Sequence, residues 1–386
     1  EDGAASIEFQ RSMGLIHSDL TIGPAVTSAI PLQANDGVCF QGPTLVGKGF
    51  RIAAEDFHSL NLKTAALPPA VRRYIGGRDL VQSGDERWVI DLFGLDEKRA
   101  REDYPELYQR LMETVWPERQ QQKRDNYKRN WWIFGEPRPG LRRAIGGLRR
   151  YLATVETSKF KPFVFVAGDV VPDHKLYAIA LDDAWGLGVL SSRVHAVWAL
   201  AAGGTLEDRP TWTNTTCFLP FAFPVCAFDV ADRIRQLGEQ LDAHRKRQQA
   251  AHPGLTITGM YNVLEKLRAG EELTAKERVI HEQGLVSVLK QIHDELDAAV
   301  FEAYGWPVTL TDEEILERLV ALNHERAEEE KRGIVRWLRP EFQNPQGKKG
   351  AVQDEIPGTA PKKAKKSAKT ETPAKTEKRP WPKELP

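Results

Sequence analysis

Two neighbouring apolar runs decide the fold class: Pro162-Phe163-Val164-Phe165-Val166-Ala167 and Leu176-Tyr177-Ala178-Ile179-Ala180-Leu181, separated by the turn residues Val171-Pro172-Asp173-His174. Short runs rich in β-branched and aromatic residues, bounded by turn residues, are typical of strands. A third such run covers 87–93, and helical periodicity covers 105–129 and 187–202. We therefore expect 23–225 to form one mixed α/β domain.

The pattern changes at Phe228. Ile234, Leu237 and Leu241 follow at helical spacing, and similar stripes cover 261–268, 275–304 and 312–332. Thr274 and Thr311 are candidate N-caps, each followed by carboxylates in the first helical turn. We expect 226–340 to be an all-helical domain whose apolar stripes form a core rather than a cofactor site, so that the fold class is α+β.

Composition sets further bounds. The 386 residues are 41% hydrophobic and 28% charged with a formal net charge of zero, which is typical of a globular protein with about two domains. Cys39, Cys217 and Cys226 have no paired spacing, which predicts buried free thiols and a cytoplasmic location. No apolar run is long enough to cross a membrane, so no membrane partner is expected.

The two ends of the chain differ from the rest. The Lys/Pro/Ala-rich residues 341–386 are predicted to be a disordered basic linker, because they contain too few apolar residues to form a core. Residues 1–22 are interpreted as a linker or as the end of a preceding methyltransferase domain. The first residue is Glu1 rather than Met, and a Trp-Pro pair follows the linker, so we expect the chain to be part of a longer protein.

Several stretches resemble catalytic motifs without completing them. Residues 42–49 approach a phosphate-binding loop, but Gly49 stands where the Mg²⁺-ligating hydroxyl belongs. Pro172-Asp173 lacks the downstream acidic and lysine residues of a nuclease site, and His281-Glu282 lacks the second histidine of a zinc protease. No Asn/Asp-Pro-Pro-aromatic tetrapeptide and no glycine loop for S-adenosylmethionine is present. We expect no catalytic residues, no metal and no cofactor in this chain.

Positive charge is concentrated in one stretch. The stretch from Arg119 to Lys161 contains twelve basic residues and only three acidic ones, Asp125, Glu136 and Glu156. This is an excess of nine positive charges in a chain that is neutral overall. Trp131, Trp132, Phe134 and Tyr151 are interleaved with them. Such an excess is the electrostatic signature of phosphate contacts, which favours nucleic acid as the partner. The two tryptophans are predicted to be core residues.

At these residues the chain resembles the MmeI-like family, namely its target-recognition and C-terminal regions. The segments that carry the resemblance are WWIFGEPRP (131–139), RRYLAT (149–154), LGVLSSRVH (187–195) and FLPFAFP (218–224), with PLQAN (31–35) and LVGKGF (45–50) upstream. The family comprises single-chain adenine-N6 DNA methyltransferases, some fused to a nuclease, of restriction-modification and phage-defence systems. The resemblance implies that S-adenosylmethionine binds the methyltransferase domain of the parent polypeptide.

The resemblance also implies a function and its residues. The chain would be the module that recognises a sequence in double-stranded DNA, with bases read by Glu156, Ser158, Lys159 and Lys161. A carboxylate accepts from cytosine N4, and a lysine donates to guanine; lysine stands where the family often has arginine. The expected phosphate contacts are Lys128, Arg129, Arg138, Arg142, Arg143, Arg149, Arg150 and Arg193.

Two other functions remain open from the residues alone. A stand-alone enzyme with an unfamiliar site would have to use Asp182, Asp183 and His195. Asp182-Asp183 are more typical of a turn and a helix cap, and His195 falls on an apolar helix beside Trp198. A structural or assembly role of the helical domain is the third alternative.

Overall fold

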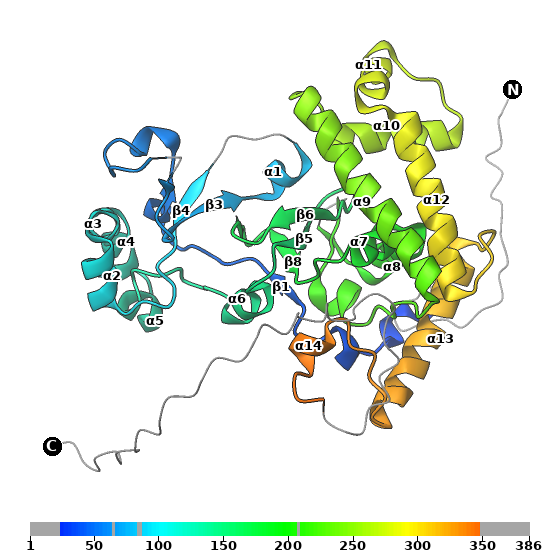
Figure 1. The fold of residues 1–386 in the computed structure, drawn as a ribbon, viewed down its shortest axis with the longest axis horizontal. Coiled ribbons are helices and arrows are strands. Elements are labelled where there is room, and N and C mark those ends of the chain that lie inside the picture. The colour runs from blue at the N-terminus through cyan, green and yellow to red at the C-terminus, as the bar shows by residue number, and fades with distance from the viewer. Residues whose placement is uncertain (1–23, 64–65, 83–86, 207–208, 348–386) are drawn as a thin grey trace, which may run out of the picture.

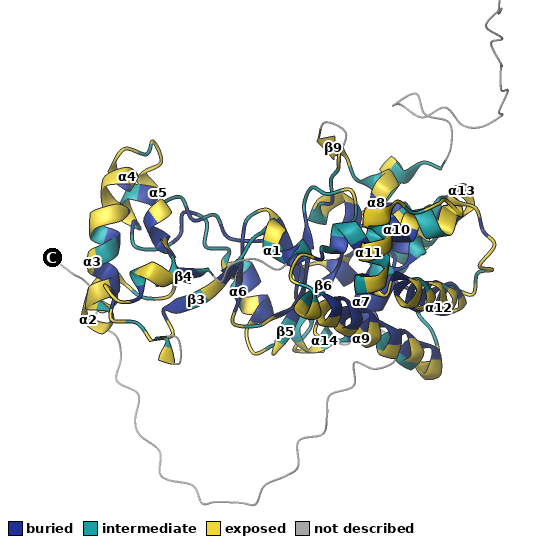
Figure 2. Cartoon of the chain, turned by 90° about the horizontal axis from the view of Figure 1, so that it is seen from above, coloured by how far each residue is buried: buried dark blue, intermediate teal, exposed yellow. Residues whose placement is uncertain are grey.

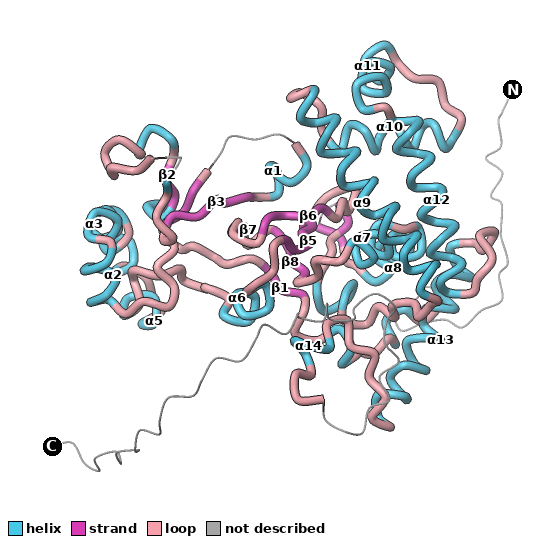
Figure 3. The backbone as a smooth tube through the Cα atoms, in the orientation of Figure 1, coloured by secondary structure: helices cyan, strands magenta, loops and turns pink. Residues whose placement is uncertain are grey.

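The computed structural model describes residues 24–63, 66–82, 87–206 and 209–347, and the expectations for 1–22 and for the basic tail beyond residue 347 lie outside these ranges. Figure 3 shows strands in the middle of the molecule with helices on both sides. The described part is α+β, as predicted. The strands are β1 (Cys39–Gln41), β2 (Arg51–Ile52), β3 (Val71–Ile75), β4 (Trp88–Ile90), β5 (Arg150–Val155), β6 (Val164–Ala167), β7 (Val171–Pro172), β8 (Leu176–Ile179), β9 (Thr205–Leu206) and β10 (Arg209–Pro210).

The helices surround these strands (Figure 1). They are α1 (Gly77–Val81), α2 (Glu97–Asp103), α3 (Pro105–Thr114), α4 (Trp116–Gln120), α5 (Asp125–Arg129), α6 (Pro139–Ile145), α7 (Ala184–Ser191), α8 (Arg193–Ala202), α9 (Phe228–Ala251), α10 (Ile257–Ala269), α11 (Ala275–Gly284), α12 (Val286–Tyr304), α13 (Asp312–Lys331) and α14 (Pro340–Gln343).

Two four-stranded sheets organise the α/β region. The central sheet has the order β1-β8-β5-β6, all antiparallel, and the smaller sheet has the order β2-β4-β3-β7. The only parallel pair in these two sheets is β3 with β7, which aligns Tyr74 with Val171. Because β7 leads directly into β8, this pair connects the two sheets.

Each sheet belongs to its own apolar core, and the two lobes are visible in Figure 2. The smaller core joins β2, β3 and β4 to α2 and α3. The larger core joins the central sheet to helices α7–α13 and runs without a break through residue 226, the position of the expected boundary. Close helix contact explains this continuity: a Cβ on Gly188 would lie 2.6 Å from Ile234 Cγ2, and one on Gly238 would lie 2.4 Å from the carbonyl oxygen of Ala184.

Three of the expected helices are divided. Residues 105–129 form α3, α4 and α5, because Pro117 has no amide hydrogen and stands in the first turn of a new helix. The 187–202 stretch divides at Ser192, whose side chain caps α8 by accepting from the amide of His195. The 275–304 stretch divides at Leu285, which adopts the left-handed conformation with φ of 42°.

The two predicted N-caps are confirmed. Thr274 and Thr311 cap α11 and α13, each in a reciprocal capping box with the glutamate three residues on. The three cysteines are free, and two of them are buried. Within the described ranges, no helix is long and apolar enough to cross a membrane.

Candidate nucleic-acid interface

Strand β5 divides the basic stretch into two parts. Arg149 lies just before the strand and Glu156 just after it, so extended chain separates them by roughly 23 Å. Arg119 does not lie at the surface. Its side chain is buried and donates to the carbonyl oxygens of Leu45 and Ile133 at 2.9 Å each. Burial lowers the pKa of Arg119 to about 10. Arg119 therefore holds the loop that precedes β2 rather than facing a ligand.

The side chain of Arg142 also binds groups inside the protein rather than facing solvent. Its guanidinium donates to both carboxylate oxygens of Asp91 at 2.6 and 3.0 Å, and Nε donates to the carbonyl oxygen of Pro137 at 2.7 Å. The side chain of Arg142 is 15% exposed and that of Asp91 only 3%. The rings of Phe93 and Phe134 lie 4.5 and 5.5 Å from the guanidinium carbon. This ion pair joins α6 to the loop after β4.

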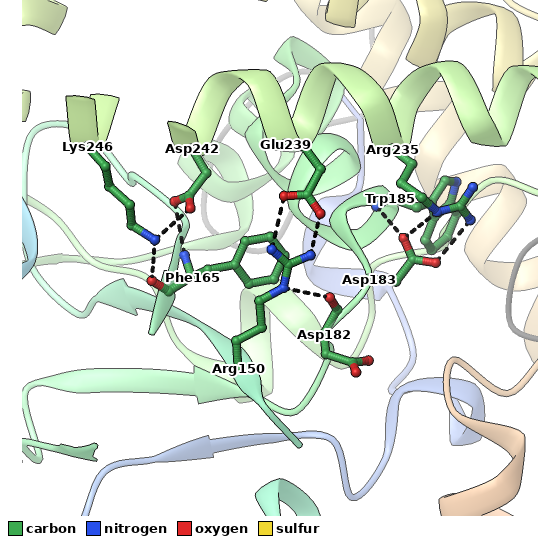
Figure 4. A network of polar contacts seen from close by, with 9 residues as sticks. All are labelled: Arg150, Phe165, Asp182, Asp183, Trp185, Arg235, Glu239, Asp242 and Lys246. Carbon is green, nitrogen blue, oxygen red and sulfur yellow. Dashed lines mark hydrogen bonds and ion pairs between the residues drawn. The ribbon is translucent and has the colours of Figure 1, made fainter. Parts of the chain in front are cut away.

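Arg138 and Arg150 are partly exposed and each has a carboxylate partner. Arg138 pairs with Glu136 at 2.9 Å. Figure 4 shows Arg150 between Glu239 of α9 and the carbonyl oxygen of Asp182, with its guanidinium 3.6 Å from the ring centre of Phe165. The pair with Glu239 raises the pKa of Arg150 and lowers that of the glutamate. It fastens the start of β5 to the helical region.

The remaining four cations of the predicted phosphate group within this stretch have no such partner. Within the described ranges, none of them forms an ion pair, and their side chains are exposed or half-buried: Lys128, Arg129, Arg143 and Arg149. The first two belong to α5 of the smaller lobe, whereas Arg143 is on α6 and Arg149 precedes β5. Arg193 lies elsewhere, at the start of α8, where it pairs with Asp312 at 2.6 Å.

The predicted base-reading residues lie in the connection from β5 to β6, which we call the recognition segment (156–161). Glu156 is half-buried, and its nearest cation is Lys175, at 4.0 Å between Oε2 and Nζ. Ser158 is half-buried as well. Lys159 is exposed and donates to Glu265 and Asn262 of α10 at 2.6 and 2.9 Å.

Lys161 has a different environment within the same segment. Its ammonium donates to the carbonyl oxygens of Ser158 and Pro210 at 2.7 and 2.6 Å, and to that of Glu156 at 3.3 Å. Burial lowers the pKa of Lys161 to about 8. Lys161 therefore ties the recognition segment to the β9–β10 hairpin, which also meets it through the bridge between Thr157 and Thr211.

Sequence reasoning missed a second group of polar residues at the junction of the two sheets. Tyr74 on β3 donates to Asp173, and the guanidinium carbons of Arg51 and Arg87 lie 5.5 and 6.0 Å from the centre of its ring. Burial raises the pKa of Tyr74 above its ordinary value. Asp173 lies in the turn that follows β7, and in the same turn Lys175 lies 4.0 Å from the carboxylate of Glu156. Because Pro172-Asp173 were interpreted only as turn residues, this polar group was not predicted.

The glycine-rich stretch that resembles a phosphate-binding motif without completing it has a structural role. In the glycine-rich 42–49 segment, the amides of Gly42, Thr44 and Lys48 donate to Leu176, Glu136 and Glu118. A Cβ on Gly49 would lie 1.9 Å from the hydroxyl of Thr114. These contacts give the segment a structural role, in which it joins β8, the loop before α6, and α4.

The alternative enzyme residues are likewise occupied. Asp183 caps α7 and pairs with Arg235, and Asp182 accepts from Arg150 through its backbone. His195 is buried against Phe163 and Phe221, and burial lowers its pKa to about 3. Among the described residues, no group of three His, Cys, Asp or Glu side chains is arranged to hold a metal ion.

Comparisons with known proteins identify a family and two proteins that this chain resembles. The family model described as "MmeI, target recognition domain" matches residues 42–225, ending where the helical domain was expected to begin. DNA methyltransferase A of Bacillus subtilis (strain 168) is 25% identical over 173 residues, covering 45% of this chain and 17% of that protein.

A solved structure of the Type IIL restriction-modification enzyme MmeI in complex with DNA is similar in fold. Its TM-score is 0.59 at 18% sequence identity, over 80% of this chain and 38% of that one. The chain thus spans well under half the length of each of these two relatives.

Proposed function

We propose that this chain belongs to the MmeI-like family, whose target recognition domain model matches residues 42–225, and that it is the part of a larger protein that recognises a sequence in double-stranded DNA. The parent would be an adenine-N6 DNA methyltransferase of a restriction-modification or phage-defence system, working in the cytoplasm. The match of 42–225 to the family's recognition domain carries this proposal, because that range contains the whole recognition segment.

The four cations without carboxylate partners are the proposed phosphate contacts: Lys128, Arg129, Arg143 and Arg149. Arg138, Arg150 and Arg193 would first have to leave their carboxylates, and Arg142 would have to leave a buried one. If four phosphates are neutralised, the logarithm of the DNA association constant should fall with the logarithm of salt concentration with a slope of about −3.6. Phosphate contacts of this kind fix orientation and carry no sequence information.

Glu156, Ser158 and Lys159 are the proposed readers of base edges. A carboxylate near DNA is repelled by phosphates unless it finds an amino group of cytosine or adenine, so Glu156 suits base contact better than backbone contact. Lys159 can reach a guanine by exchanging Glu265 for the base, since both partners are exposed. Lys161 would act mainly by shaping the segment, since all three of its N–H groups already have carbonyl acceptors.

Methyl transfer would take place outside this chain. S-adenosylmethionine would bind the methyltransferase domain of the same polypeptide, because the glycine-rich segment described above uses the amides of Gly42, Thr44 and Lys48 for contacts within the protein. The contribution of this chain to the reaction is then positional: it decides which adenine meets that domain.

The test is binding of the chain to duplex DNA, measured by fluorescence anisotropy at several salt concentrations. Replacing the four proposed phosphate contacts with alanine should weaken binding to all sequences and flatten the salt slope. A matched control replaces four exposed cations of the helical region, Lys276, Arg278, Arg318 and Arg332. Equal losses in the two variants, or binding of the native chain that does not depend on salt, would contradict the proposal.

Base reading is tested in the full-length parent by sequencing its methylated sites. Glu156→Ala should change the preferred base at one position, at about 1–3 kcal/mol per wrong base pair. Lys175→Ala serves as the control, because it removes the nearest cation of Glu156 and leaves the carboxylate in place. An unchanged recognition sequence with a lower rate would show that Glu156 does not read a base.

A further inference from the structure

A cavity of about 260 Å³ lies between the recognition segment and the helical region. One wall is formed by Phe160 and Phe163, and the facing walls come from α8, α10 and α12. Ala196 and Leu200 on α8 are exposed and line it, while Leu264 of α10 completes the apolar lining. The volume is just below the range of sites for drug-sized ligands, so the cavity suits one ring system with a small polar group.

The charges around this cavity do not balance. Its lining contains five cationic side chains and two carboxylates: Lys159, Lys161, Arg193, Arg245 and Arg268, with Glu265 and Asp297. Glu265 is paired with Lys159, and Arg268 lies 3.5 Å from Asp297 and 3.0 Å from Asp294. Arg193 pairs with Asp312, which lies outside the lining. Within the described ranges, neither Lys161 nor Arg245 has a carboxylate within ion-pair distance.

Of these two cations, Arg245 is the more deeply buried. It is 1% exposed, and its partners are all neutral: the carbonyl oxygens of Phe163 and Leu241 at 2.9 and 3.3 Å and the hydroxyl of Tyr261 at 3.3 Å. These contacts use three of its five N–H groups, which leaves two for a ligand. A buried cation is costly without an anion. In the same cavity lining, the hydroxyl of Ser191 is buried and has no hydrogen-bond partner among the residues that the structure describes.

We propose that this cavity binds a nucleoside monophosphate, with the phosphate at Arg245 and the base against Phe160, Phe163 and Leu264. Arginine offers planar, paired donors that match phosphate, and apolar and aromatic side chains suit a base. The nucleotide has two possible sources: it is free in solution, or it is an extrahelical nucleotide of DNA lying on the recognition segment. Only the second source rests on the proposed function, because only that source requires bound DNA.

The first experiment is calorimetric titration of the chain with 5′-dAMP in the absence of DNA. Saturable binding at one site is expected. Arg245→Met should weaken it roughly ten- to hundredfold, the value of a lost charge-assisted hydrogen bond, whereas Arg247→Met on the exposed face of the same helix should not. Deoxyadenosine, which lacks the phosphate, should bind as weakly as 5′-dAMP binds Arg245→Met.

A second pair of variants guards against misfolding of Arg245→Met. Ala196→Phe fills the cavity from an exposed helical position and should block 5′-dAMP, while Ala201→Phe, exposed on the same helix but outside the lining, should not. Absence of saturable binding to the native chain up to about 10 mM overturns the proposal. Native-like binding by Ala196→Phe also overturns it.

The second experiment identifies the source. Duplexes carrying 2-aminopurine at single positions are mixed with the chain, and a rise in fluorescence reports an unstacked base. A rise that 5′-dAMP and Ala196→Phe both suppress identifies an extrahelical nucleotide; no rise at any position, with 5′-dAMP binding intact, identifies free nucleotide. If the chain fails to bind DNA at all, the proposed function fails, but the calorimetric result is unaffected.

Discussion

Two adjacent arginines, Arg142 and Arg143, provide the sharpest test of how the fold divides the basic stretch. They are one residue apart on α6 and identical in charge, yet Arg142 is bound to the buried Asp91 and Arg143 is exposed without an ion-pair partner in the described ranges. We expect Arg142→Ala to destabilise the fold and Arg143→Ala to weaken DNA binding.

The magnitude follows from the buried pair. Removing one partner of a buried ion pair leaves the other charge uncompensated, at a cost of about 3–5 kcal/mol. Arg72, at 3.2 Å from Asp91, compensates part of this charge, so we expect the lower end, about 3 kcal/mol. For a chain of 386 residues, at about 2.1 cal/mol/K of unfolding entropy per residue, that corresponds to a fall in the melting temperature of roughly 4 °C. Arg143→Ala should change stability by less than about 0.5 kcal/mol, because surface substitutions rarely do more.

Both variants are measured by thermal unfolding and by DNA binding at several salt concentrations. Arg143→Ala should reduce the magnitude of the salt slope by about 1 and leave the melting temperature unchanged. Folded Arg142→Ala, assayed well below its melting temperature, should keep the native slope. A native melting temperature for Arg142→Ala together with a reduced slope would refute the assignment of Arg142 to the interior.

Three further predictions concern the junction, the pH dependence and the recognition segment. Gly42→Ala should cost roughly 1–3 kcal/mol in a denaturant titration, because its Cβ would lie 2.2 Å from a backbone oxygen, whereas Gly254→Ala has open space around it and should be nearly neutral. Burial raises the pKa of Asp297 to about 6, so its contribution to stability is lost as pH rises from about 4 to 6; Asp297→Asn should remove this part of the pH profile, and a profile identical to the native one would exclude it. Glu265→Gln should release Lys159 and tighten DNA binding with a stability change below about 1 kcal/mol, and weaker DNA binding would contradict the exchange of partners.

The sequence predicted elements well where a local signal decides the structure. The apolar runs became β4, β6 and β8, and the threonine caps mark the starts of α11 and α13. Helix ends within long periodic stretches were missed, because Ser192 and Leu285 end helices through a side-chain cap and a left-handed backbone that periodicity does not reveal.

The candidate interface was predicted only as a list of charges. Counting cations between 119 and 161 cannot distinguish Arg142 from Arg143, since their difference depends on Asp91, which lies 51 residues before Arg142 in the sequence. In the same way, the partners of Lys159 lie on α10, more than one hundred residues away. Ion pairing across the fold, rather than local charge, decides which cations remain available to a ligand.

These long-range contacts attach the helical region to the recognition segment and to the strand that follows it. Arg245 of α9 holds the carbonyl oxygen of Phe163, and Asp242 and Lys246 hold the amide and carbonyl of Phe165 at 3.1 and 2.7 Å. The strand that follows the recognition segment is therefore fixed by a helix beyond residue 225, where the match to the recognition-domain model ends. If the recognition segment reads bases as proposed, a domain transplanted without α9 and α10 would lose the contacts that position the proposed base-reading side chains. On this proposal the unit that carries specificity extends to about the end of α10.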